Sequence, residues 1–161
     1  EFFAYGELAR PSGWFYSRAQ PRSPFYVFQI RIGYRITMAT KNVSEDEFAQ
    51  LIDENDIVLV DFWAAWCGPC RNFAPVYEQT SEKFPDVVFA KVDTEAEQGL
   101  ARAANVTSIP TIMAFRENVL VFSQAGALNQ TQLEDLVTAV KGIDMSEVHK
   151  QIAEEAAQAD S

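Results

Sequence analysis

Residues 66–70 read WCGPC, and this short stretch contains both cysteines of a 161-residue chain. One glycine and one proline separate Cys67 from Cys70. Three kinds of cysteine pair have this spacing: a structural disulfide, half of a metal site, or a pair that forms and breaks a disulfide during its reaction. The function of the chain depends on which of the three applies.

A structural disulfide here would stabilise the chain little. Closing a four-residue loop gives about 2 kcal/mol, against roughly 4.7 kcal/mol for a loop of about one hundred residues. A closed zinc site needs four Cys or His ligands, and besides the two cysteines the chain offers only the distant His149. Zinc would therefore need ligands from a second chain. We expect no metal and favour the redox-active pair.

The length of 161 residues suits one domain with a hydrophobic core. The net charge of −10 is unevenly spread, since residues 1–37 contain five arginines and two acidic residues, whereas residues 38–161 contain eight Lys or Arg and 21 Asp or Glu. This acidic body argues against nucleic acid as a partner, because phosphate binding uses clustered Lys and Arg. No stretch approaches the roughly 18 apolar residues of a membrane span, so we expect no contact with a membrane.

Residues 1–37 hold ten of the 20 aromatic residues and three of the seven prolines, without a lasting helical or strand period. They lack the apolar core and cleavage site of a secretory signal. An Arg-rich, acid-poor transit peptide fits somewhat better, but the chain begins at Glu1 rather than at Met. We interpret this segment as a poorly ordered leader, either non-native or translated from upstream, with Met38 as the natural start. A targeting segment is the alternative.

From Met38 onward the sequence alternates between helix and strand signals. Capping patterns, in which a Ser, Thr, Asn or Asp precedes a Glu or Gln by three positions, predict helix starts at Ser44, Thr94, Asn129 and Asp144. Apolar runs predict strands over residues 57–63, 87–93, 111–116 and 119–124. The helices predicted between them cover about 44–54, 68–83, 95–104 and 130–141.

This order predicts an α/β fold with a mixed sheet. The last two strands meet through the short segment REN (residues 116–118), which indicates an antiparallel hairpin, and strands separated by helices are expected to run parallel. The hairpin lacks a turn glycine, so we expect a positive φ at Asn118. Gly142 is a plausible helix stop. Residues 144–161 then form an acidic helical tail, which we interpret as solvated or weakly docked, with a partner helix as the alternative.

The cysteine pair follows a buried strand and begins a helix. Unpaired amides and the positive end of the helix dipole stabilise a thiolate there. Residues three apart on a helix have Cα atoms about 5 Å apart, within the range that a disulfide accepts. We expect Cys67 to be an exposed thiolate that attacks a client disulfide, and Cys70 to be a shielded thiol that resolves the mixed disulfide. Gly68 would let a client backbone approach, and Pro69 suits an early helical position.

Asp61 lies inside an apolar strand, where loss of hydration raises the pKa of a carboxyl group. We interpret it as a general acid/base for Cys70; an exposed strand edge is the alternative. Lys91, on the neighbouring strand, would pair with Asp61 or be an ordinary surface lysine. Pro110 begins a strand, which is typical of an edge strand, and spacing does not decide whether its peptide bond is cis. Trp63 suits the core, and Trp66 a contact surface.

From about Met38 to Ile143 the chain resembles the thioredoxin family. The matching segments are VDFWAAWCGPCRNFAPVYEQ, FAKVDTE, NVTSIPTIMAF and AGAL, in the family's order and at similar intervals. The resemblance implies a thioredoxin fold, in which helices flank both faces of a central mixed sheet. It also implies a cytoplasmic protein-disulfide reductase that serves electron transport and cell redox homeostasis.

Carried over by motif, Cys67 is the nucleophile, Cys70 the resolving thiol, Asp61 the buried acid/base and Lys91 its modulator. The resemblance implies a substrate groove formed by Trp66, Gly68, Pro69, Ile109, Pro110, Gly126 and Ala127, with Pro110 in the cis form and a kink in the active-site helix at Pro75. It implies no bound cofactor: electrons would come from NADPH through a flavin-containing thioredoxin reductase. Client proteins with disulfides are the other expected partners, and we expect a monomer.

Two departures and two rival functions stay open. Arg71 stands where the family more often has Lys, and the acidic tail lies outside the familiar domain. A disulfide oxidase or isomerase is one rival, although the Gly-Pro pair between the cysteines resembles the reducing members. A binding subunit that uses the groove without thiol chemistry is the other.

Overall fold

The computed structural model describes residues 40–159, all within the unit Thr37–Ser161. The proposed leader at residues 1–37 lies outside the described residues. The described helices are α1 (Glu45–Glu54), α2 (Gly68–Lys83), α3 (Gln98–Ala103), α4 (Gln130–Lys141) and α5 (Met145–Ala159). The strands are β1 (Lys41–Asn42), β2 (Ile57–Trp63), β3 (Val88–Asp93), β4 (Thr111–Arg116) and β5 (Val119–Ala125). Among these described strands only β1 was not predicted.

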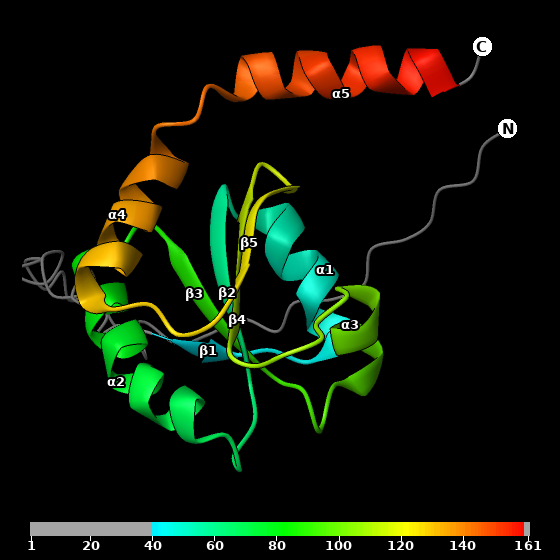
Figure 1. Ribbon diagram of the computed structural model, residues 1–161. Coiled ribbons are helices and arrows are strands. Elements are labelled where there is room, and N and C mark those ends of the chain that lie inside the picture. The colour runs from blue at the N-terminus through cyan, green and yellow to red at the C-terminus, as the bar shows by residue number, and fades with distance from the viewer. Residues whose placement is uncertain (1–39, 160–161) are drawn as a thin grey trace, which may run out of the picture. The chain divides into compact units, whose positions relative to one another are not determined.

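The described strands form one mixed sheet in the order β1-β3-β2-β4-β5 (Figure 1). β3 runs parallel to both β1 and β2, and β4 and β5 form the predicted antiparallel hairpin. The expectation that strands separated by helices run parallel is wrong for β4, which pairs antiparallel with β2 and places Thr111 opposite Phe62. The physical reason is the length of α3: six residues span only about 9 Å, so the chain does not return along the sheet before β4 begins.

Each face of the sheet carries its own core. Side chains of β2 alternate between the two faces, as strand geometry requires: Leu59 packs with the residues of α2 and α4, whereas Val58 and Val60 pack on the other face. Phe73 and Tyr77 of α2 are buried on the first face. The central sheet flanked by helices is thus confirmed, and the core on the α2 and α4 side fixes the position of the helix that carries the cysteines.

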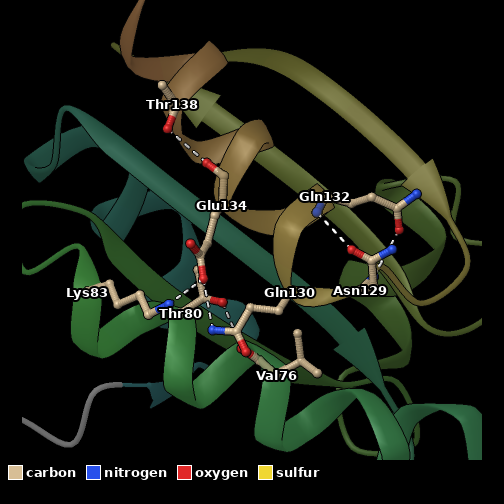
Figure 2. Close-up of polar contacts among 8 residues, drawn as sticks. All are labelled: Val76, Thr80, Lys83, Asn129, Gln130, Gln132, Glu134 and Thr138. Carbon is tan, nitrogen blue, oxygen red and sulfur yellow. Dashed lines mark hydrogen bonds and ion pairs between the residues drawn. The ribbon is translucent and has the colours of Figure 1, made fainter.

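Two of the predicted capping boxes are present. Glu47 accepts the amide of Ser44 at 3.3 Å at the start of α1. At the start of α4 the Asn129 side chain accepts the amide of Gln132 at 2.9 Å, and the reciprocal bond is also 2.9 Å (Figure 2). Each box satisfies amides that the helix itself leaves unpaired.

The helix start predicted at Thr94 is wrong. α3 begins at Gln98 after the N-cap residue Glu97, whose side chain makes no capping bond. The Thr94 hydroxyl instead donates to the carbonyl oxygen of Trp63 at 3.1 Å. The Thr94 side chain therefore bonds to the backbone of β2 instead of capping a helix, and the residues before Gln98 form a loop.

Helices α2 and α4 lie side by side on one face and are joined by polar contacts (Figure 2). Lys83 of α2 contacts the Glu134 carboxylate of α4 at 2.6 Å, and Gln130 donates to the same oxygen at 2.8 Å. α2 continues through Pro75, which has no amide hydrogen to donate to the preceding turn. The contacts with α4 support this helix along the half that follows the proline.

The β4–β5 turn and the tail meet at one end of the sheet. Glu117 and Asn118 have φ values of 48° and 64°, so the positive φ expected at Asn118 is confirmed, while that at Glu117 was not predicted. The Arg116 guanidinium donates to three carbonyl oxygens at the C-terminal end of α4, at 2.6 to 3.0 Å; those of Val140 and Lys141 belong to the last turn of the helix, and that of Ile143 follows it. His149 of α5 contacts Glu117 at 2.9 Å. The first turns of the tail therefore contact the rest of the described chain, through His149 and through the buried Met145.

Candidate active site

The two cysteines lie at the N-terminus of α2, as predicted. Cys67 is the N-cap residue, and Pro69 occupies the first turn, where an amide hydrogen has no helical partner. The Cα atoms of Cys67 and Cys70 are 5.3 Å apart, and their sulfurs form a disulfide. The Cys70 amide donates to Cys67 Sγ at 3.1 Å. An amide donor and a helix N-terminus both favour negative charge at the position of this sulfur.

The expected exposure of Cys67 is wrong for the disulfide form. The exposed fractions of Cys67 and Cys70 are 3% and 2%, because Ala64 and both cysteines pack into one small cluster. The two sulfurs still differ in what they face. Cys67 lines a surface groove of about 550 Å³, and Cys70 is not among its lining residues. Cys67 Sγ also lies 3.8 Å from the carbonyl oxygen of Ile109.

Four of the seven predicted substrate-binding residues line this groove: Trp66, Gly68, Pro69 and Ile109. Trp66 is 68% exposed, and its indole nitrogen donates to Glu95 at 3.2 Å. A Cβ atom on Gly68 would meet nothing within 4 Å, so the space beside the sulfurs is open. An exposed aromatic side chain next to an open backbone position is suited to contact another protein.

The other three predicted residues, Pro110, Gly126 and Ala127, are not among the lining residues. The Ile109–Pro110 bond is cis, which confirms the form that the resemblance implied. Pro110 accepts the amide of Gly126 at 2.8 Å, so Gly126, with φ at 104°, is joined to the segment that carries Ile109. β4 is not an edge strand, since it lies between β2 and β5; Pro110 is tolerated because it precedes the strand and donates nothing.

Five lining residues were not predicted: Thr94, Ala101, Val106, Thr107 and Ser108. They come from the loop after β3, from α3 and from the loop before β4. A sequence signal for part of this wall existed, because Asp93 ends β3 at the same edge of the sheet at which Trp63 ends β2. Loops that leave the carboxyl ends of neighbouring parallel strands lie close together.

Asp61 lies on the central strand β2, two residues before its end, with 1% of its surface exposed. Its predicted burial is confirmed, and the exposed-edge alternative is wrong. Burial raises the pKa of the Asp61 carboxyl to about 7, and the charge of Lys91 opposes this shift. Among the described residues neither carboxyl oxygen has a hydrogen-bond partner. Asp61 shares the sheet face of Leu59, which is the face covered by the helix that carries Cys70.

Lys91 stands directly opposite Asp61 in the register of β2 and β3. The described side chains do not bring the two groups within ion-pair distance; instead Lys91 Nζ lies 5.1 Å from the centre of the Trp63 ring. Trp63 is half-buried, packs against the cysteine cluster, and has a buried indole nitrogen without a described partner. The charge of Lys91 therefore lowers the pKa of Asp61 across space, without a direct ion pair or hydrogen bond.

Within residues 40–159 no cluster of three or more His, Cys, Asp or Glu side chains could hold a metal ion. The helices of this same part of the chain are too short or too polar to cross a membrane.

Comparisons with known proteins agree with this site. The thioredoxin family model matches residues 39–139. A Streptomyces coelicolor protein named "Putative thioredoxin 2" is 50% identical over 121 residues, which cover 75% of this chain and 90% of that protein. Thioredoxin C-3 of Corynebacterium nephridii is 43% identical over 93 residues, or 57% of this chain and 64% of that protein.

Solved structures give the same result. A thioredoxin structure from Plasmodium falciparum has a TM-score of 0.58 and 38% identity, and the match covers 62% of this chain and 97% of that one. A mutant thioredoxin from Halobacterium salinarum has a TM-score of 0.61 and 33% identity, over 65% and 93% of the two chains. With a matching family model, a thioredoxin fold and a disulfide-forming pair at the start of α2, this chain belongs to the thioredoxin family of thiol-disulfide oxidoreductases.

Proposed function

We propose that the chain reduces protein disulfides with a division of labour between its two cysteines. The Cys67 thiolate attacks a client disulfide, forms a mixed disulfide and releases the first client thiolate, which takes up a proton. The Cys70 thiolate then attacks Cys67 Sγ, forms the Cys67–Cys70 disulfide and releases the second client thiolate. Two electrons pass to the client. The observation that supports this order is that Cys67 lines the groove and Cys70 does not.

Asp61 is the proposed acid/base of the second step. Cys70 is a thiol in the resting dithiol form and must lose its proton before it attacks Cys67. A carboxyl group whose pKa is about 7 exchanges protons near neutral pH. Lys91, opposite Asp61 on β3, favours the ionised carboxylate and so adjusts the pH at which the exchange occurs.

The groove is the proposed docking site for clients. Trp66, Gly68 and Pro69 form one wall, and Ile109 offers its backbone on the other. Pro110, Gly126 and Ala127 extend this surface, because the Gly126 amide is bonded to the Pro110 carbonyl. We further propose that the protein acts as a monomer in a reducing compartment such as the cytoplasm. There a flavin-containing, NADPH-dependent thioredoxin reductase would regenerate the dithiol.

Trapping of the mixed disulfide tests the proposed roles. Incubated with insulin, the reduced Cys70→Ser protein should accumulate a covalent complex through Cys67, because the resolving thiol is missing. The Cys67→Ser protein should neither reduce insulin nor trap it. A Cys67→Ser protein with normal activity, or trapping through Cys70, would refute the assignment. A reduction potential above about −180 mV would indicate an oxidase or isomerase instead.

A further inference from the structure

The segment that carries the reactive cysteine is fastened by the loop after β3. Trp63 ends β2, and its carbonyl oxygen accepts two hydrogen bonds from Thr94: one from the amide at 2.9 Å and one from the hydroxyl at 3.1 Å. The neighbouring Glu95 accepts the indole hydrogen of Trp66 at 3.2 Å. Two consecutive residues of one loop therefore hold both ends of the connection between β2 and Cys67.

This connection is short. Only residues 64–66 separate Trp63 from Cys67, and the Cys67 amide donates to the Ala64 carbonyl at 3.1 Å, which closes a tight turn. A turn closed in this way has few free torsions. The Trp63 peptide, the Trp66 side chain and the Cys67 sulfur therefore belong to one short, hydrogen-bonded segment.

Thr94 is also a lining residue of the groove that contains Cys67 and Trp66. The residue is half-buried, so its hydroxyl is bonded to the Trp63 carbonyl while part of its surface borders the groove. A carbonyl oxygen has two lone pairs, and both bonds of this one come from Thr94. The backbone bond would persist in any non-proline variant, which makes the hydroxyl bond separable by mutation.

We propose that Thr94 is a positioning residue for client docking. Its hydroxyl fixes the Trp63 carbonyl and with it the turn that presents Trp66 and Cys67 to the groove. This inference rests on the proposed function, in which Cys67 meets the client disulfide in this groove. Losing the hydroxyl bond should weaken the docking of a protein client while leaving the chemistry of the sulfurs intact.

The experiment compares three variants of the full chain. Thr94→Val removes the hydroxyl and keeps the branched shape, whereas Thr94→Ser keeps the hydroxyl and removes the methyl group. Thr138→Val is the matched control, because Thr138 also donates to a carbonyl, that of Glu134 at 2.9 Å, but lies on α4 outside the groove (Figure 2). If Thr94→Val does not fold, Thr94→Ala replaces it.

For Thr94→Val we expect KM for insulin to rise on the order of three- to tenfold, the range given by one neutral hydrogen bond, with little change in kcat. The rate with a small aromatic disulfide, which does not need the whole groove, should change by less than about twofold if the bond serves docking. Thr94→Ser should restore KM, and Thr138→Val should match the parent protein.

Several outcomes would overturn the inference: an unchanged KM in the Thr94→Val variant, an equal loss with both substrates, or no restoration by Thr94→Ser. The Cys67→Ser protein separates this test from that of the proposed function. If Cys67→Ser is inactive while Thr94→Val behaves as the parent, only the role of Thr94 is refuted. If Cys67→Ser remains active, the proposed function itself fails.

Discussion

The two ends of the sheet satisfy their polar groups differently. At the end where β2 and β3 finish, the cluster of Ala64 with the two cysteines is apolar, and Asp61 and Trp63 bury polar atoms that have no described partner. At the opposite end the Arg116 guanidinium donates to three carbonyl oxygens, and Glu117 contacts His149. The end that carries the cysteines therefore has buried polar atoms without a described partner, which lowers the free energy of unfolding, whereas the polar groups named at the opposite end are hydrogen-bonded.

The contrast suggests that residues at the end with the cysteines serve the reaction, whereas those at the end with Arg116 serve the stability of the fold. A buried polar group without a partner costs free energy, and here that cost keeps the pKa of Asp61 in the range where proton transfer is useful. The bonds of Arg116 stabilise the α4 terminus but lie far along the chain from the cysteines. Substitutions at the first end should therefore change activity and pH dependence, and substitutions at the second should change stability alone.

Asp61→Asn should give the largest effect. Because the folded protein holds the proton up to about pH 7 and the unfolded chain releases it near pH 4, the free energy of unfolding should fall as pH rises through this interval. The variant should lose this slope and be more stable by about 4 kcal/mol at pH 8, yet close to the parent at pH 4. Urea unfolding at a series of pH values measures this difference.

The same variant should resolve mixed disulfides at least about tenfold more slowly near pH 7, since it lacks the proposed acid/base. Stopped-flow release of a client from the mixed disulfide measures this step. Asp53→Asn is the matched control, because Asp53 is an exposed carboxyl at the opposite end, near Asn118. An equal gain in stability from Asp53→Asn, or no pH slope in the parent, would contradict the contrast between the ends.

Arg116→Met should destabilise the protein by about 2–3 kcal/mol, because it removes charged hydrogen bonds to three carbonyl groups while keeping a long apolar side chain. Insulin reduction per folded molecule should be unchanged. Urea unfolding of the variant is compared with that of Arg102→Met, whose parent side chain makes one long 3.4 Å contact on the surface of α3. A drop in kcat would show that the two ends are coupled.

Much of the fold could be predicted because its signals are local. The bounds of β2, α2 and α4 follow from an apolar run, from the cysteine pair with Pro69, and from the Asn129 capping box, and the structure has the predicted bounds. The antiparallel direction of β4 could not be predicted, because it depends on the end of the sheet at which the chain emerges from the short helix α3. The failed helix start at Thr94 has the same origin: a carbonyl distant in sequence competes for the hydroxyl.

The site shows the same division. The helix terminus that carries Cys67 and Cys70 and the burial of Cys70 and Asp61 follow from sequence neighbours, and both are confirmed. The far wall of the groove, including Val106 and Thr107, comes from residues whose types indicate no chemistry of their own and which tertiary structure brings to the sulfurs. The low exposure of Cys67 was also missed, because a position at a helix tip does not show what packs over it.

The tail should give the smallest effect. Removing residues 144–161 deletes the buried Met145 and the contact between His149 and Glu117, whose side chains are 48% and 43% exposed. Burying Met145 stabilises by roughly 2 kcal/mol, but ordering α5 offsets part of this, so truncation should cost about 1 kcal/mol. His149→Ala alone should change stability by less than about 0.5 kcal/mol, since exposed ion pairs contribute little. Urea unfolding and insulin reduction measure both variants; a truncated protein that folds but has lost its activity would mean that the stabilising end also takes part in the reaction.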